Sequence, residues 1–205
     1  MFVEKIVRIV FFLVAPLFLL GFECPAGQEL VTAICANNPD LPECELVVFV
    51  TSTDHVGDFG GITGGDLICN ARAASSPLAG KTFVAWLSSS SVDARDRLSV
   101  GRFVRPDGVL VANSIDDLTD GSIANEIRLD ENSSDVGRSR VWTATTTQGT
   151  VDPAGRTCSD WTVRSNNTRG IGGITAFGNF SSNWTFAFHS PCTGQYPLYC
   201  FEVRR

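Results

Sequence analysis

Seven cysteines are spread along this 205-residue chain, and their positions constrain its fold more than any other feature. The chain has two histidines and no Cys-x-x-Cys pair, whereas structural zinc sites need clustered ligands. We therefore expect disulfides, formed in an oxidising compartment. Cys35 and Cys44 lie close enough in sequence to form a local pair, which leaves Cys24 as the odd thiol. The seven are Cys24, Cys35, Cys44, Cys69, Cys158, Cys192 and Cys200.

The N-terminus has the pattern of an export signal. Two early cations, Lys5 and Arg8, precede an uncharged and almost wholly apolar run over residues 9–22. This run is shorter than the roughly 20 residues that span a bilayer, but it suits a signal-peptide core. We expect residues 1–22 to be a signal peptide, with an uncleaved membrane anchor as the alternative. The protein is then secreted or held in the cell envelope.

Cys24 follows this segment and raises a second route to the membrane, lipid attachment. Bacterial lipoproteins modify a cysteine after the apolar core, but they need a small residue just before it. Phe22 and Glu23 occupy those positions, so the match is poor. Residues 23–45 carry three cysteines and three prolines, are too short for a core, and are expected to be a leader or linker. Residues 46–205 then form one domain.

The charge of the chain limits its partners. Its formal value is −6, and lysine occurs only as Lys5 and Lys81. An acidic exported domain has no general field that would hold a polyanion, so nucleic acid is not an expected partner. Contact with a membrane is expected only through the N-terminal segment or a lipid. Almost all positive charge is arginine, which still permits one local arginine site.

Hydrophobic patterning predicts an α+β domain. Thr63 and Asp66 form a capping-box pattern in front of apolar residues at helical spacing. Residues 113–140 and 157–183 are rich in Asp, Asn, Ser and Gly, and are predicted to be long loops. The predicted strands are 46–50, 82–87, 141–143, 184–188 and 197–203, with a second, short helix at 91–98 and a hairpin turn at 105–108.

Short motifs in residues 46–203 resemble those of a known family. Gly64-Gly65-Asp66, Cys69 and Phe83-Val84-Ala85-Trp86-Leu87 look like the first half of the endostatin domain of collagens. Cys158-Ser159-Asp160-Trp161 and Cys192-x7-Cys200-Phe201-Glu202 look like its second half. A bacterial family of exported and lipoprotein domains of unknown function, with the same endostatin-like shape, matches still more closely. Its marks are Val48-Phe49-Val50-Thr51-Ser52, Ala94-Arg95-Asp96-Arg97-Leu98, Asp117-Leu118-Thr119-Asp120-Gly121, Leu129-Asp130-Glu131-Asn132, Val141-Trp142-Thr143 and Leu198-Tyr199-Cys200-Phe201-Glu202.

The resemblance implies a C-type-lectin-like fold with two helices, short antiparallel strands and long loops. It also implies nested disulfides, with Cys69 joined to Cys200 and, inside that loop, Cys158 joined to Cys192.

Calcium is the first ligand to consider, because many C-type lectins use it to hold sugars. The Glu-Pro-Asn or Gln-Pro-Asp and the Trp-Asn-Asp tripeptides of that site are missing, so the usual lectin sugar site is not expected. The acidic loops still offer oxygen ligands, and Asp130, Glu131 and Asp135 are the candidates for a structural calcium. The alternative is that these carboxylates are solvated and form turns and caps.

Other side chains were weighed as sites of binding or catalysis. Trp86, Trp142 and Trp161 are expected in the core, whereas Trp184 is expected to be partly exposed. Trp184, with Arg164 and Arg169, forms the candidate set of ligand contacts. His55 and His189 form no zinc cluster, and no Gly-x-Ser-x-Gly nucleophile elbow occurs, so an enzyme is not expected.

These inferences predict an exported, non-catalytic recognition or adhesion domain that binds an extracellular or cell-surface macromolecule, either a protein or a glycan. Loops on a disulfide-fixed scaffold are the expected contact surface. The alternatives are a structural envelope protein without a specific ligand and a calcium-dependent carbohydrate-binding module. No cofactor other than that calcium is expected.

Overall fold

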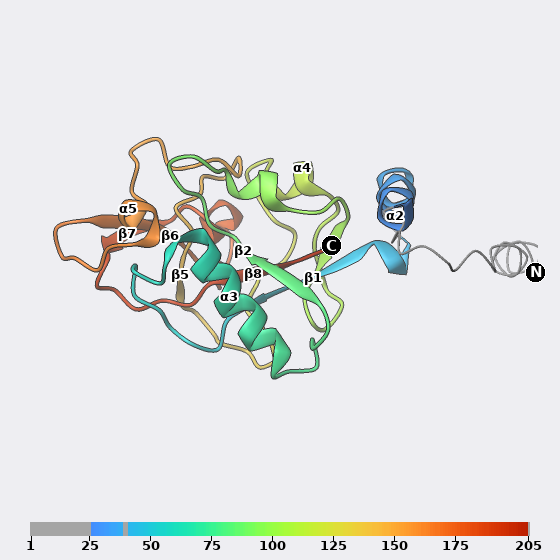
Figure 1. The fold of residues 1–205 in the computed structure, drawn as a ribbon, viewed down its shortest axis with the longest axis horizontal. Helices are drawn as coiled ribbons and strands as arrows, with labels where there is room; N and C mark the ends of the chain where they lie inside the picture. Colours follow the sequence, from blue (N-terminus) through green and yellow to red (C-terminus); the bar gives the residue numbers. More distant parts are fainter. Residues whose placement is uncertain (1–25, 39–40, 205) are drawn as a thin grey trace, which may run out of the picture.

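The computed structural model describes residues 26–38 and 41–204 (Figure 1). The expected signal peptide and Cys24 lie outside the described residues. Within them the chain is a mixed α+β structure with four helices, two sheets and three disulfides. The α-helices are α2 (Ala26–Asn37), α3 (Gly61–Ala74), α4 (Ile115–Leu118) and α5 (Cys158–Trp161), and the 3-10 helices are η1 (Pro42–Cys44), η2 (Ala94–Arg97) and η3 (Ser181–Trp184).

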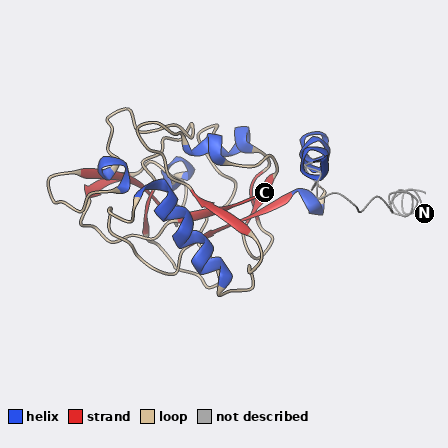
Figure 2. Cartoon of the chain, in the orientation of Figure 1, coloured by secondary structure: helices blue, strands red, loops and turns tan. Residues whose placement is uncertain are grey.

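Two sheets organise the chain, and long loops join most of their strands (Figure 2). The larger sheet has the order β2-β8-β1-β3-β4 and the smaller one β5-β6-β7. Strand β1 pairs in parallel with β3, so the expectation of antiparallel strands is wrong for this pair. The connection from β1 to β3 passes through α3 and β2, which gives the length that a parallel crossover needs. The strands are β1 (Glu45–Val50), β2 (Thr82–Ala85), β3 (Arg102–Val104), β4 (Leu110–Ala112), β5 (Arg140–Trp142), β6 (Arg169–Ile174), β7 (Phe188–Pro191) and β8 (Tyr199–Val203).

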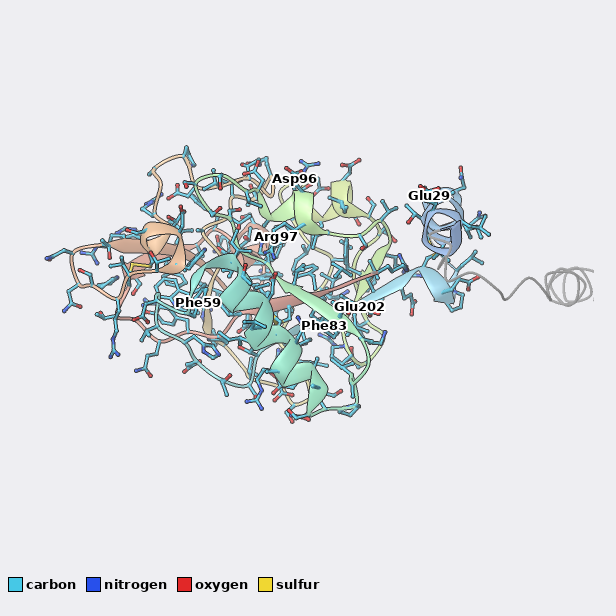
Figure 3. The ribbon with its side chains drawn as sticks, in the orientation of Figure 1. Glu29, Phe59, Phe83, Asp96, Arg97 and Glu202 are labelled. Atoms are coloured by element: carbon cyan, nitrogen blue, oxygen red, sulfur yellow. A yellow bond between two sulfur atoms is a disulfide. The ribbon has the colours of Figure 1, made fainter. Side chains whose placement is uncertain are left out.

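Helix α3 packs along the edge strand β2 and covers its backbone. The helix begins at Gly61, two residues before Thr63, so the predicted capping box is wrong. Asp66 instead accepts a hydrogen bond from the Ala85 amide at 2.9 Å and pairs with Arg97 at 2.6 Å. Figure 3 labels Arg97 together with Phe83 of β2. Asn70 both accepts from the Phe83 amide and donates to its carbonyl. These side chains occupy groups that an open sheet edge would present to other chains.

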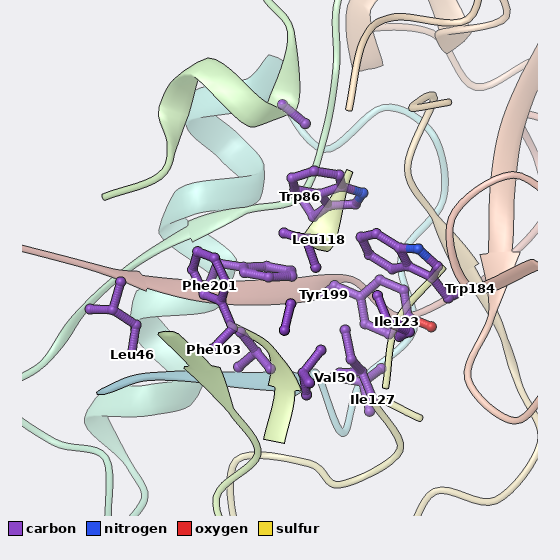
Figure 4. Close-up of a cluster of buried hydrophobic side chains, with 14 of the residues drawn as sticks. Leu46, Val50, Trp86, Phe103, Leu118, Ile123, Ile127, Trp184, Tyr199 and Phe201 are labelled. Carbon is purple, nitrogen blue, oxygen red and sulfur yellow. The ribbon is translucent and has the colours of Figure 1, made fainter. Parts of the chain in front are cut away.

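Two hydrophobic clusters fill the body. One lies between the larger sheet and the loops and contains Trp86, Phe103, Tyr199 and Phe201 (Figure 4). Trp184 belongs to it and is 0% exposed, so the expectation of a partly exposed ring is wrong. Its ring packs 5.1 Å from that of Trp86, and a Cβ on Gly173 would lie 1.7 Å from its carbonyl oxygen. The glycine therefore admits the close backbone approach that draws this tryptophan inward.

The second cluster surrounds two disulfides. Cys69–Cys200 joins α3 to β8, and Cys158–Cys192 lies within the loop that it closes, so the expected nested pairing is present. Trp142 and Trp161 pack here and are 0% exposed, as expected for core residues. The third disulfide, Cys35–Cys44, joins α2 to η1. Three disulfides are consistent with an extracellular or otherwise oxidising environment.

Several expected elements differ from the observed ones. Within the leader, α2 forms a helix that the sequence did not predict. The expected helix at 91–98 is the 3-10 helix η2, and the expected strand at 184–188 is the end of η3 followed by β7. Strand β6 lies inside the segment predicted to be loop. In the part of the chain that the structure describes, no helix has the length and apolar character to cross a membrane.

Candidate functional site

The three carboxylates predicted to bind calcium are held separately. Asp130 accepts hydrogen bonds from the amides of its own turn, at Asn132 and Ser134. Asp135 pairs with Arg128, and this hydrogen bond lowers the pKa of the carboxyl.

Glu131 is almost fully buried and accepts hydrogen bonds from the Ser52 amide and hydroxyl. Its carboxylate also lies 3.3 Å from Nε of Arg72. Among the described residues, no three His, Cys, Asp or Glu side chains gather as metal ligands would. These carboxylates therefore bind protein donors.

The predicted ligand contacts do not form one surface. Trp184 is buried, whereas Arg164 and Arg169 are exposed and have no carboxylate partner within the described chain. Arg169 begins β6 opposite Pro191, five residues from Ile174, which pairs with Arg140. Because successive side chains alternate between faces, Arg169 and Arg140 lie at opposite ends and on opposite faces of the small sheet.

The structure brings a different arginine onto aromatic rings, in a group that we call the arginine–aromatic cluster: Arg140, Phe188, Ser190 and Tyr196. The guanidinium carbon of Arg140 lies 4.8 Å from the centre of the Phe188 ring and 5.9 Å from that of Tyr196. Nη1 of Arg140 donates to the Tyr196 hydroxyl at 3.2 Å. That hydroxyl is 2.9 Å from Oγ of Ser190. A cation above an aromatic face within about 6 Å of its centre is attracted by the ring.

Glycines in β6 explain why these rings can lie so close to the sheet. A Cβ on Gly172 would come within 2.6 Å of Phe188, its partner across the strands. A Cβ on Gly170 would come within 2.7 Å of Trp142. The strand therefore presents backbone without side chains to the rings, and the Trp142 ring packs edge-on against that of Tyr196, with 4.7 Å between the ring centres. The cluster therefore packs on the glycines of β6 and on the Trp142 ring.

His55 contacts Tyr196 and Trp142 through its backbone. It forms an isolated bridge with Tyr196, and its carbonyl accepts a hydrogen bond from the Trp142 indole at 2.8 Å. Burial lowers the pKa of the half-buried His55 ring, which lies 3.0 Å from the Thr53 hydroxyl. His189 is exposed on β7. The contacts of His55 place it as a support of the cluster.

The charges of the chain are divided unevenly along it. Residues 136–205 contain seven arginines and three Asp or Glu residues, a net charge of +4. Residues 24–135 contain seven Lys or Arg and 17 Asp or Glu residues, a net charge of −10. Arg140 begins β5 and Arg138 lies two residues before it; both are exposed, and no described carboxylate pairs with either. Five of these seven arginines lie between Arg138 and Arg169, in the segment that contains β5 and the start of β6, whereas the other two follow β8 of the larger sheet.

Two of the hollows in the described part of the chain contain an arginine and offer weaker alternatives. The larger, about 660 Å³, separates the end of α2 from η2 and α4, and the Arg95–Asp116 ion pair at its rim satisfies both charges. The smaller, about 170 Å³, lies between Phe186 and His189. Arg156 stacks there 5.9 Å from Phe186, but it already pairs with the buried Asp152. In the arginine–aromatic cluster, by contrast, Arg140 is an exposed cation that contacts aromatic rings and has no carboxylate partner among the described residues.

Searches for related proteins returned no match, either to a protein-family model or to a curated protein.

The arrangement offers groups that can bind a partner. A guanidinium fixed above a ring, beside two hydroxyl groups, can recognise an anionic or polar group on a partner. The sequence showed that arginines are frequent in the second half of the chain. It could not show which of them lies against Phe188, 48 residues further on.

Proposed function

We propose that this chain is an exported, non-catalytic recognition protein whose C-type-lectin-like, endostatin-like domain binds an extracellular or cell-surface protein or glycan. The observation that carries the proposal is the exposed guanidinium of Arg140, which is held over Phe188 and hydrogen-bonded to Tyr196. Arginine and large aromatic side chains supply much of the binding energy at protein interfaces.

The position of the cluster supports the same function. The smaller sheet and α2 lie at opposite ends of the molecule (Figure 1). Attachment through the segment before α2, whether by an apolar anchor or by a lipid on Cys24, would leave the cluster directed away from the point of attachment. The three disulfides suit the oxidising surroundings that this role requires. The nested pairing and the α+β architecture agree with the endostatin-like fold.

Arrays of extracellular proteins and glycans test the proposal. We expect wild-type protein to bind at least one partner, and Arg140→Ala and Phe188→Ala to weaken that binding by about tenfold or more. Arg164→Ala is the control for loss of an exposed arginine. Near-ultraviolet circular dichroism checks that each variant is folded. Silence across broad panels, or binding that Arg140→Ala leaves unchanged, would favour a structural envelope protein instead.

A further inference from the structure

We infer that the arginine–aromatic cluster is a carboxylate-recognition site, and that its partner is an acidic segment of a protein. This inference rests on the proposed function, because it assigns a ligand chemistry to the same surface. Three observations support it: the hydrogen-bond donors of Arg140 that no described residue uses, the aromatic rings that other groups cover, and the distribution of charge along the chain.

Arg140 keeps donors that no described residue uses. Its Nη1 donates to Tyr196, whereas Nε and Nη2 have no acceptor within the described chain. The contact with the Phe188 ring and the hydrogen bond from Nη1 to Tyr196 restrain the guanidinium at two points, which limits the directions that its remaining donors can take. A carboxylate matches a guanidinium edge with two parallel hydrogen bonds. A positioned guanidinium also loses less side-chain entropy on binding than a free one.

The hydroxyl pair beside the guanidinium is positioned as well. Ser190 is 5% exposed, and its hydroxyl meets that of Tyr196 at 2.9 Å. A Cβ on Gly194 would lie 2.7 Å from the Tyr196 ring and 2.9 Å from Oγ of Ser190. The turn therefore needs a glycine to leave room for this pair. The Tyr196 hydroxyl accepts from Arg140 and links the guanidinium to Ser190, which restrains the whole group before a partner arrives.

The aromatic rings of the cluster do not form a platform for sugars. The guanidinium covers the Phe188 ring, and Tyr196 packs edge-on against Trp142 and Phe188. The four tryptophans of the chain are at most 1% exposed. Phe180, 69% exposed, lies on the loop after β6 and has no ring partner within the described chain. A covered ring beside an open guanidinium edge favours an acidic peptide over a glycan.

The distribution of charge along the chain also favours an acidic partner at the cluster. The segment that contains the cluster has a net charge of +4, whereas the preceding segment has −10. Arg138 and Arg140 are exposed and have no described carboxylate partner, so an acidic peptide is attracted to the start of β5. Its affinity then falls with added salt, since exposed charges are screened over about 10 Å at 0.1 M ionic strength.

Fluorescence anisotropy with the full-length protein tests the inference. The probes are a labelled peptide of alternating aspartate and glycine, the same peptide with asparagine, and a sulfated heparin oligosaccharide of equal charge. We expect the aspartate peptide to bind and the asparagine peptide to fail. Arg140→Lys keeps the charge but removes the oriented edge, and should weaken binding about tenfold. Arg138→Lys, two residues away on an unstacked arginine, should change it by less than about twofold.

Three results would overturn the inference: equal binding of the asparagine peptide, equal losses from Arg138→Lys and Arg140→Lys, or tighter binding of the sulfated sugar. The last two would indicate a diffuse cationic patch. The proposed function fails separately. The arrays could instead identify an uncharged partner whose binding is abolished by Arg140→Ala, while no acidic peptide binds. That result would support the recognition function and contradict the carboxylate site.

Discussion

In the larger sheet, polar side chains near the edge strand are used within the protein, whereas in the smaller sheet an arginine is left for the outside. Asp66 and Arg97 pair over β2 with side chains that are 18% and 12% exposed. Arg140 lies on the edge strand β5 with a ring and a hydroxyl as its partners and no described carboxylate. The first arrangement closes an edge, and the second prepares a contact. Charge alone therefore does not identify a site; the partners of each charge do.

The disulfides give this comparison its largest test. Replacing Cys69 and Cys200 by alanine removes a closure of 131 residues, and replacing Cys158 and Cys192 removes one of 34. Chain entropy predicts losses in the free energy of unfolding of about 5 and about 4 kcal/mol. Urea denaturation of each double variant and of the wild type, in the same buffer without reductant, measures both losses.

The second of these losses should fall below its entropic value. Cys158 to Trp161 are four consecutive residues with φ between 52° and 65°, a left-handed turn. This conformation costs roughly 1–2 kcal/mol for each residue with a Cβ. Without Cys158–Cys192 the turn can relax and recover part of that cost. A greater loss from the smaller closure than from the larger one would contradict this account.

Removing one charge from each sheet should separate stability from binding. Asp66→Ala leaves the Ala85 amide without its acceptor and Arg97 without its carboxylate, and should lower the free energy of unfolding by about 3 kcal/mol. Arg140→Ala loses an exposed stacked cation, and should lower it by less than about 1 kcal/mol. Chemical denaturation of both variants measures the difference. Equal losses would show that Arg140 is a structural group rather than one kept for a partner.

The left-handed turn offers a smaller effect of opposite sign. Ser159 is exposed and has φ 54°, so Ser159→Gly removes a steric cost and should stabilise the protein by about 1 kcal/mol. Ser159→Ala is the matched control, because alanine keeps the Cβ and should bring no comparable gain. Thermal unfolding of the three proteins, measured side by side, shows the order. Stabilisation by both substitutions would indicate that the serine side chain, and not the backbone conformation, is unfavourable there.

The sequence predicted much of the larger sheet, and the reason lies in its side chains. The run Leu46–Val50 and the turn 105–108 are encoded by local apolar and turn residues, and both appear where expected. Strand β6 was missed because its Arg-Gly-Ile-Gly-Gly-Ile sequence has the composition of a loop. Its glycines are required by neighbours from distant segments, such as Val141, whose carbonyl oxygen would lie 2.1 Å from a Cβ on Gly172.

The candidate site was hidden for the same reason. From the sequence, Trp184 was expected to be partly exposed, and Phe188 was not singled out as a contact. Gly173 instead lets the Trp184 backbone approach β6 and directs its ring into the core. The sequence alone does not distinguish Arg140 from Arg164 and Arg169. The register of β5 and β7 on β6 is what places Arg140 over the Phe188 ring. Local pattern predicts elements, whereas a site assembled across strands depends on their pairing.

The smallest expected effect concerns Asp160, the third residue of the left-handed turn. Its carboxylate accepts from the Ser90 hydroxyl at 2.6 Å and from the Ser90 amide at 2.7 Å. The side-chain hydrogen bond is the main cause that lowers the pKa of this carboxyl. A carboxyl whose pKa is lower in the folded state stabilises the protein above the unfolded value of about 3.9, and this stabilisation is lost as the pH falls through the folded value.

Ser90→Ala should therefore raise the pKa of Asp160 and reduce the difference in stability between neutral and acid pH. Carbon NMR of the aspartate carboxyl groups, titrated in wild type and variant, measures the shift. Asp107 is the control within the same spectra, because its pKa is lowered by its own hydrogen bond to Arg105 and should not move. An unchanged Asp160 would mean that Ser90 does not hold the turn in solution, and that the disulfide and the Trp161 indole, which donates to the Ser88 carbonyl, keep it left-handed by themselves.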